Sequence, residues 1–191
     1  LERPERESLQ KPAEVLAALA FKPGERVADI GSGSGYFTIP VAKAVGPAGV
    51  VWAEDIVQQL LDSVAKRVEA EKLTNVRLKL VAKDDPQLPP GGVDTILMVD
   101  TLHYVQGRSG YAKKLRAGLA PGGRVVVIDY IPKSFAERPW GPTPEQQMSR
   151  ETVDAEFAAA GLTPIKVHTF LPEQYFVEYG VAPAGGGRTA R

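Results

Sequence analysis

The sequence predicts an α/β fold, with a doubly wound, mostly parallel seven-stranded sheet, an antiparallel C-terminal strand and helices on both faces. Two observations support this prediction. From residue 25 to about residue 131, apolar runs rich in β-branched residues alternate with stretches of helical period, which is typical of a parallel sheet. Two of these runs, TILMV and RVVVI, contain no alternating polar residues, as expected of strands that are covered on both faces.

Five strands are expected in the first two thirds of the chain: Arg26–Ile30, Val50–Glu54, Val76–Val81, Thr95–Val99 and Arg124–Asp129. Helices separate several of them. Between Val57 and Val68, apolar residues recur on one face of a helix. A second helix, Gly110–Leu119, is expected to end at the turn APGG. A third begins near Phe37, because Pro40 is tolerated in the first turn of a helix.

The last third of the chain predicts a loop, a helix and a hairpin. Four prolines and Trp140 between Pro132 and Pro144 indicate the loop. The helix follows in SRETVDAEFAAAGL, with Ser149 or Thr152 as its cap. Two strand-like runs, TPIKVHTF and QYFVEYGV, are joined by only LPE, which favours a hairpin and therefore an antiparallel edge of the sheet.

Composition fits one soluble globular domain. The 191 residues are 43% hydrophobic and 24% charged, with 23 basic and 23 acidic residues. A chain of this length buries a core without disulfides or metals. The balanced charge, without a dense basic stripe, argues against nucleic acid or an anionic membrane as a partner. The absence of cysteine excludes disulfides, thiolate metal sites and a cysteine nucleophile, and no other metal site is expected.

The two ends of the chain are expected to lie outside the main domain. Residues 1–22 indicate a charged lead-in and one helix, residues 23–181 the domain, and residues 182–191 a disordered tail. No apolar run approaches a membrane span, and no basic-then-apolar leader is present. The chain begins with Leu1 rather than Met, so an upstream segment has been removed or left out. The default location is the cytoplasm unless that segment directs the protein elsewhere, and the oligomeric state does not follow from the sequence.

Three glycines within five residues follow the first expected strand. The run DIGSGSG places Gly31, Gly33 and Gly35 directly after the strand and before a helix. Because glycine costs backbone entropy on folding, such a cluster indicates that a ligand approaches the backbone closely; the alternative is a tight turn with incidental glycines. The P-loop pattern G-x-x-x-x-G-K-[ST] is absent. The dinucleotide pattern G-x-G-x-x-G is not met either, because Tyr36 occupies the place of its third glycine.

The order D-x-G-x-G-x-G resembles the motif of class I S-adenosylmethionine-dependent methyltransferases. Three later features are similar to the same family: V-x-A-x-D-I at the second strand, an acidic segment after the third strand, and L-x-P-G-G before the fifth. The resemblance covers Pro23 to about Tyr130 and extends more loosely to Tyr179. It implies S-adenosylmethionine as the cofactor.

The resemblance also implies which residues bind this cofactor. Asp29 is expected to meet the ammonium group, directly or through water, and Asp55 to accept hydrogen bonds from both ribose hydroxyls, unless it is only a solvated strand end. Asp84 or Asp85 is expected at the adenine amino group, although Ala82 stands where the family has its first acid, and a turn or capping role is an equal alternative. The expected cofactor-binding residues are Asp29, Gly31, Ser32, Gly33, Gly35, Asp55, Ile56, Asp84, Asp85 and Asp100.

The chemistry is expected at the carboxyl ends of the central strands, where the fourth strand delivers VDTLHYV. His103 and Tyr104 are the candidate catalytic residues, beside Asp100. An imidazole exchanges protons near neutral pH, which suits a general base. The alternative is that His103 caps a helix or lines the pocket without moving a proton. His168 is expected to be structural, and Trp140 to be either a lid over the acceptor or a packed aromatic.

These features predict methyl transfer from S-adenosylmethionine to a small-molecule acceptor by in-line displacement. No [DN]-P-P-[YF] follows the fourth strand, which argues against nucleobase amines and amide nitrogens as acceptors, and the absence of cysteine argues against cytosine-carbon methylation. Two alternatives stay open. One is a module that binds the cofactor without catalysis, and the other is an NAD-binding oxidoreductase, against which the early third glycine counts.

Overall fold

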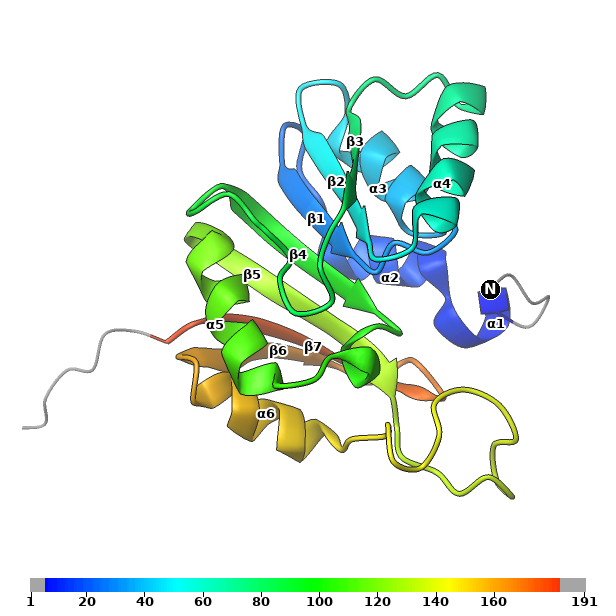
Figure 1. The fold of residues 1–191 in the computed structure, drawn as a ribbon, viewed down its shortest axis with the longest axis vertical. Coiled ribbons are helices and arrows are strands. Elements are labelled where there is room, and N and C mark those ends of the chain that lie inside the picture. The colour runs from blue at the N-terminus through cyan, green and yellow to red at the C-terminus, as the bar shows by residue number, and fades with distance from the viewer. Residues whose placement is uncertain (1–5, 183–191) are drawn as a thin grey trace, which may run out of the picture.

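The computed structural model describes residues 6–182, in which seven strands form one sheet. The strands are β1 (Arg26–Ile30), β2 (Val50–Asp55), β3 (Val76–Leu80), β4 (Val93–Val99), β5 (Leu119–Tyr130), β6 (Leu162–His168) and β7 (Gln174–Val181). Their order across the sheet is β3-β2-β1-β4-β5-β7-β6 (Figure 1). Strands β1 to β5 pair in parallel, whereas β7 is antiparallel to both of its neighbours. The predicted fold class is confirmed.

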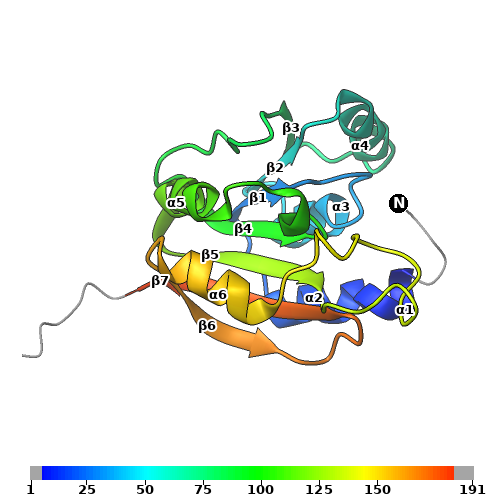
Figure 2. The same ribbon diagram turned by 60° about the horizontal axis from the view of Figure 1, so that its bottom comes forward.

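Helices cover both faces of the sheet (Figures 1 and 2). They are α1 (Arg6–Gln10), α2 (Pro12–Leu19), α3 (Thr38–Val45), α4 (Gln58–Ala70), α5 (Arg108–Gly118) and α6 (Arg150–Ala158), with one short 3₁₀ turn, η1 (Leu102–Tyr104). Apolar side chains of α2, α3 and α4 pack on one face, and those of α5 and α6 pack on the other. No helix among residues 6–182 is both long and apolar enough to cross a membrane.

Successive side chains of the central strand β4 enter opposite cores. Ile96 and Met98 lie in the cluster with α5 and α6, while Leu97 and Val99 lie in the cluster with α2, α3 and α4. Burying a side chain of this size stabilises a fold by about 1.5–3 kcal/mol. A strand that is buried on both faces therefore needs an unbroken apolar run, which explains why TILMV has no polar alternation.

The chain order reverses direction between β1 and β4. From β1 the chain continues outward through β2 to β3, then crosses back to β4 and continues in the other direction to β5. At such a reversal, the connections of two neighbouring strands leave toward opposite faces of the sheet, and open α/β sheets bind their ligands there. The loops that follow β1 and β4 therefore border the expected site.

Two local predictions differ from the structure. The single N-terminal helix is two helices, because Lys11 adopts a left-handed conformation with φ 43° between α1 and α2. The APGG segment lies inside β5 rather than before it, and the pairing of β5 with β4 shifts register between Val93 and Thr95. The expected hairpin of β6 and β7, by contrast, is present and forms the antiparallel edge of the sheet. Nearly every residue of β7 is buried, whereas most of β6 is exposed, so β6 forms the edge.

Two capping predictions are confirmed. The Ser149 hydroxyl accepts a hydrogen bond from the backbone N–H of Thr152 at the start of α6, at 3.3 Å. Phe37 is the residue that precedes α3, which places Pro40 in the first turn. The lead-in up to residue 5 and residues 183–191 of the expected tail lie outside the described residues.

Candidate active site

The glycine-rich loop connects the end of β1 to the start of α3. Gly31, Gly33 and Gly35 have positive φ angles of 72°, 55° and 79°. Side chains rarely adopt this conformation, so the loop backbone requires glycine at these positions. The N–H groups of Gly31 and Ser32 both donate to the backbone carbonyl of Glu54, at 2.8 and 3.0 Å. These bonds fix the loop beside the carboxyl end of β2.

The same loop is packed against the segment after β4. A Cβ atom at Gly31 would lie 2.4 Å from both Oγ1 and Cγ2 of Thr101, so only glycine fits. The hydroxyl of Ser32 is enclosed and has no hydrogen-bond partner among the described residues. An enclosed hydroxyl without a partner costs free energy, and a ligand on the loop would supply that partner. The loops after β1 and β4 thus meet in the expected crevice.

Asp55 ends β2 and faces the glycine loop. Its Oδ2 accepts the N–H of Gly33 at 2.9 Å, and its Oδ1 accepts the N–H of Val57 at 3.0 Å. The residue is only 6% exposed. The two bonds fix the carboxylate, and each oxygen keeps a further lone pair that a hydroxyl could use. The next residue, Ile56, is 53% exposed and lines the neighbouring cleft.

Two buried carboxyl groups lie beneath the loop. Asp29 accepts a hydrogen bond from the hydroxyl of Thr38 at 2.5 Å, which ties β1 to α3, and burial raises the pKa of Asp29 to about 6. Glu54 is fully buried, with Lys79 Nζ 3.5 Å from its Oε1 but no hydrogen bond to either oxygen among the described residues. Burial raises the pKa of Glu54 to about 7. The expected contact between Asp29 and the ligand's ammonium group stays a prediction.

Asp100, directly after β4, joins three distant parts of the chain. Its Oδ2 accepts hydrogen bonds from the amide of Gln10 at 2.6 Å and from the hydroxyl of Tyr130 at 2.9 Å, and the amide of Gln174 donates to Oδ1. Burial raises the pKa of Asp100 to about 6. The backbone of Asp100 has φ 53°, which the surrounding bonds hold in place. Helix α1 is thereby attached to the carboxyl edge of the sheet.

His103 is bonded to Asp129, the penultimate residue of β5. The Nδ1 atom of His103 lies 2.8 Å from Oδ1 of Asp129, and the backbone N–H of His103 donates to Oδ2 at 3.0 Å. Both residues are buried. Tyr104, by contrast, is 57% exposed, with its ring centroid 4.1 Å from that of His103. The structure therefore brings the two candidate catalytic residues together and adds a carboxylate behind the imidazole.

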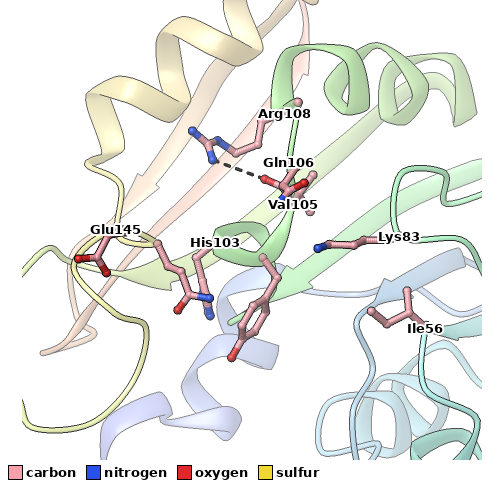
Figure 3. A pocket seen from close by; sticks show the side chains of 10 residues that line it. Ile56, Lys83, His103, Val105, Gln106, Arg108 and Glu145 are labelled. Atoms are coloured by element: carbon pink, nitrogen blue, oxygen red, sulfur yellow. Dashed lines mark hydrogen bonds between the residues drawn. The ribbon is translucent and has the colours of Figure 1, made fainter.

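A cleft of about 490 Å³ opens over this pair (Figure 3). Ile56 and Lys83 border it on the side of β2 and β3, and Glu145 borders it on the opposite side, from the loop after β5. Arg108 also lines the cleft, but its guanidinium is bound by the carboxylate of Glu156 at 2.6 and 2.9 Å. The cleft thus extends from the end of β2, past the imidazole, to the proline-rich loop.

The acidic pair after β3 has one member in a turn. Oδ1 of Asp85 accepts the backbone N–H of Gln87 at 2.8 Å, and Lys114 Nζ lies 3.3 Å from its Oδ2. The N–H of Gln87 and the charge of Lys114 lower the pKa of Asp85. The side chain of Asp84 is exposed, and its carbonyl accepts from Lys114 at 2.8 Å. These contacts support the turn role for Asp85, and the contact of either acid with adenine stays a prediction.

The proline-rich loop packs its aromatic residue beside the site. The Trp140 ring lies edge-on to the ring of Tyr130, with centroids 5.9 Å apart, and the guanidinium of Arg138 lies 4.8 Å from the Tyr130 centroid. Trp140 is therefore a packed aromatic in this structure. Its movement as a lid over the acceptor stays a prediction. His168 belongs to the β6–β7 pair, where its Nε2 is 2.7 Å from Glu178 Oε1.

Comparison with known proteins agrees with this geometry. The family described as "Methyltransferase domain" matches residues 28–125, which is just over half of the chain. The chain belongs to the class I S-adenosylmethionine-dependent methyltransferases. A crystal structure of an S-adenosylmethionine-dependent methyltransferase from Aquifex aeolicus has a TM-score of 0.85 and 26% identity, over 94% of both chains. One from Mesorhizobium loti, at 18% identity, shares the fold with a TM-score of 0.71 over 87% of this chain and 95% of that one.

Curated relatives are similar over a shorter stretch. The ubiquinone/menaquinone biosynthesis C-methyltransferase UbiE of Burkholderia cenocepacia is 30% identical over 115 residues, which are 60% of this chain and 47% of the relative. The chain therefore spans about half the length of the curated relatives it matches. Family membership gives S-adenosylmethionine as the cofactor and favours a methyltransferase over the oxidoreductase alternative.

Several residues of the site were not predicted from the sequence. They are Gln10, Asp129, Tyr130 and Gln174. Asp129 could have been found, because it is an acid at the carboxyl end of a predicted buried strand. Gln174 begins β7, and its position at the same edge follows only from the antiparallel direction of that strand.

Proposed function

We propose that this protein transfers a methyl group from S-adenosylmethionine to a small organic acceptor bound in the cleft over His103. The observation that carries the proposal is the position of that imidazole. It lies in η1, just after β4, bonded to a buried carboxylate, in a cleft that extends to the end of β2. This is where an open α/β sheet of this topology binds its ligands.

The residues around the glycine loop fit the cofactor. The enclosed, unpartnered hydroxyl of Ser32 and the fixed carboxylate of Asp55 offer hydrogen-bond sites for a ligand with ribose hydroxyls and an amino-acid end. Ile56 would pack on the adenine, because its apolar side chain is exposed beside Asp55. When bound, S-adenosylmethionine supplies a methyl group on a sulfonium sulfur, which is transferred by in-line displacement. The protein's own tasks are to orient the acceptor, to exclude water and to accept a proton.

The acceptor side of the cleft contains the groups that these tasks need. His103 provides the proton acceptor, and Tyr104 provides an exposed ring on which a planar molecule could stack. Glu145 and Gln146 border the cleft from the proline-rich loop. The curated relatives are named as C-methyltransferases of ubiquinone and menaquinone biosynthesis, which supports a small ring compound as the acceptor.

A transfer assay with methyl-tritiated S-adenosylmethionine tests this proposal. The protein is incubated with a panel of small phenols and quinols, and the label is counted in the organic extract. We expect at least one acceptor to be labelled by the wild-type protein, with the label lost in His103→Gln. The matched control is Asp62→Asn, which changes an exposed carboxylate on α4 that accepts a hydrogen bond from Gln58. Cofactor binding without label on any acceptor would favour a binding module instead.

A further inference from the structure

The bond between His103 and Asp129 fixes the imidazole at two points. One Asp129 oxygen faces Nδ1 of the ring, and the other accepts the backbone N–H of the same histidine. The backbone N–H of Tyr130 also donates to Asp129 Oδ1, at 2.8 Å. The side chains of His103 and Asp129 are only 3% and 2% exposed, so water does not compete for these bonds. The ring is therefore held in one orientation.

The carboxylate also decides which ring nitrogen carries the proton. An ionised carboxylate only accepts hydrogen bonds, so Nδ1 must donate. In a neutral imidazole, Nε2 then has a free lone pair. No hydrogen bond to Nε2 is formed by residues 6–182, and the atom is not among those enclosed without a partner. His103 lines the cleft, where Figure 3 shows its side chain, so the lone pair is available to a bound molecule.

We propose that Asp129 is a positioning residue, which holds His103 as the Nδ1–H tautomer so that Nε2 removes a proton from the methyl acceptor. This proposal rests on the proposed function of the cleft. In the step, the O–H or acidic C–H bond of the acceptor breaks, its electron pair stays on the acceptor, and the proton forms a bond to Nε2. The resulting imidazolium is stabilised by the adjacent carboxylate of Asp129. The proton is later released from Nε2 to water.

The proposal restricts the class of acceptor. A base in this position serves a nucleophile that arrives protonated, such as an alcohol, a phenol, or a ring carbon activated by a neighbouring hydroxyl. A thioether or a tertiary amine has no proton to lose and would gain nothing from His103. The acceptor is therefore expected to carry an ionisable hydroxyl or an acidic C–H, either at the atom that receives the methyl group or beside it.

Substituting Asp129→Asn tests the tautomer without any acceptor. The single amide oxygen cannot serve both the backbone N–H of His103 on one side and Nδ1–H with the backbone N–H of Tyr130 on the other, so the hold on the Nδ1–H tautomer is weakened. Nitrogen-15 spectra of the histidine-labelled 191-residue chain report the protonation of each ring nitrogen. We expect Nδ1–H alone in the wild-type protein and a measurable share of Nε2–H in the variant, with the signals of His168 unchanged. A wild-type His103 protonated only on Nε2 would overturn the proposal, as would a variant in which Nδ1–H is as fully populated as in the wild-type protein.

The kinetic consequence is measured on an acceptor from the phenol panel. We expect Asp129→Asn to lower kcat by at least about 100-fold, which is the lower range for losing a general base. KM and the affinity for S-adenosylhomocysteine should change little. The control is Asp94→Asn, at the amino end of β4, whereas the cleft lies at the carboxyl ends of the strands. It should leave kcat unchanged, although it weakens the ion pair with Arg26.

A second acceptor separates a positioning role from a structural one. With a nitrophenol that is already ionised at the assay pH, no proton has to be removed, so the defect of Asp129→Asn should largely disappear. An equal loss on both acceptors would overturn the positioning role. If the wild-type protein methylates nothing although it binds the cofactor, the proposed function fails. The tautomer experiment then decides independently whether Asp129 orients His103.

Discussion

Replacing Gly31 with alanine tests whether the glycine loop is built for close approach. Gly31 has φ 72°, and a Cβ atom there would lie 2.4 Å from two side-chain atoms of Thr101. Two costs add. A side chain in the left-handed region costs about 1–2 kcal/mol, and overpacking against an enclosed neighbour costs about 1–3 kcal/mol. We therefore expect Gly31→Ala to lower the free energy of unfolding by about 2–5 kcal/mol, and to weaken cofactor binding because the loop backbone must move.

Gly122→Ala separates the two costs. Gly122 has φ 76°, close to that of Gly31, but nothing lies within 4 Å of its Cβ position. Its substitution should carry the conformational cost alone. Guanidinium unfolding of both variants measures the difference, for which we expect about 1–3 kcal/mol in excess for Gly31→Ala. Adding Thr101→Ala to Gly31→Ala should recover part of that excess, because it removes the two nearest atoms. If Gly31→Ala is no more destabilising than Gly122→Ala, the reasoning about close approach is wrong.

Two further predictions concern buried polar groups. The folded state raises the pKa of Glu54 from 4.5 to about 7, so it favours the protonated form, and the resulting stability is lost as the pH rises through 7. Between pH 6 and 8, the free energy of unfolding should therefore fall by about 1 kcal/mol more in the wild-type protein than in Glu54→Gln. The exposed control, Glu69→Gln, should show the same dependence of the free energy of unfolding on pH as the wild-type protein. Tyr179→Phe removes the hydroxyl that donates to Asp154 at 2.7 Å in a fully buried position, and should cost about 1–2 kcal/mol in chemical unfolding. A flat wild-type pH profile, or an unchanged unfolding midpoint for Tyr179→Phe, would contradict these two predictions.

The strands and helices were predictable where one local rule dominates. The apolar run TILMV identified β4 because both faces of that strand are covered. Ser149 identified the start of α6 because a serine side chain can satisfy a free N–H there. The prediction was wrong where the pairing between strands, rather than a local sequence rule, determines the structure. The APGG segment belongs to β5, and the pairing of β5 with β4 shifts register beside it.

The candidate site was predictable only in part, for a similar reason. Spacing along the chain identified Gly31 and Asp55, because the loop and the strand end that carry them have recognisable local patterns. The partner of His103 is 26 residues away, and Gln10 and Gln174 reach Asp100 from opposite ends of the chain. Such contacts depend on the order and direction of the strands, which single-sequence patterns do not specify.

Calorimetric titration of the 191-residue chain with S-adenosylmethionine measures whether the glycine loop and Asp55 hold this cofactor. We expect one binding site with micromolar affinity, similar binding of S-adenosylhomocysteine, and no heat with NAD. Asp55→Asn should weaken the affinity for both sulfur ligands by at least about tenfold, because a charged hydrogen bond is worth about 1.5–3 kcal/mol. The Asp62→Asn control should bind as the wild type does. Folded protein that binds neither sulfur ligand would contradict the account, as would binding that is unaffected by Asp55→Asn.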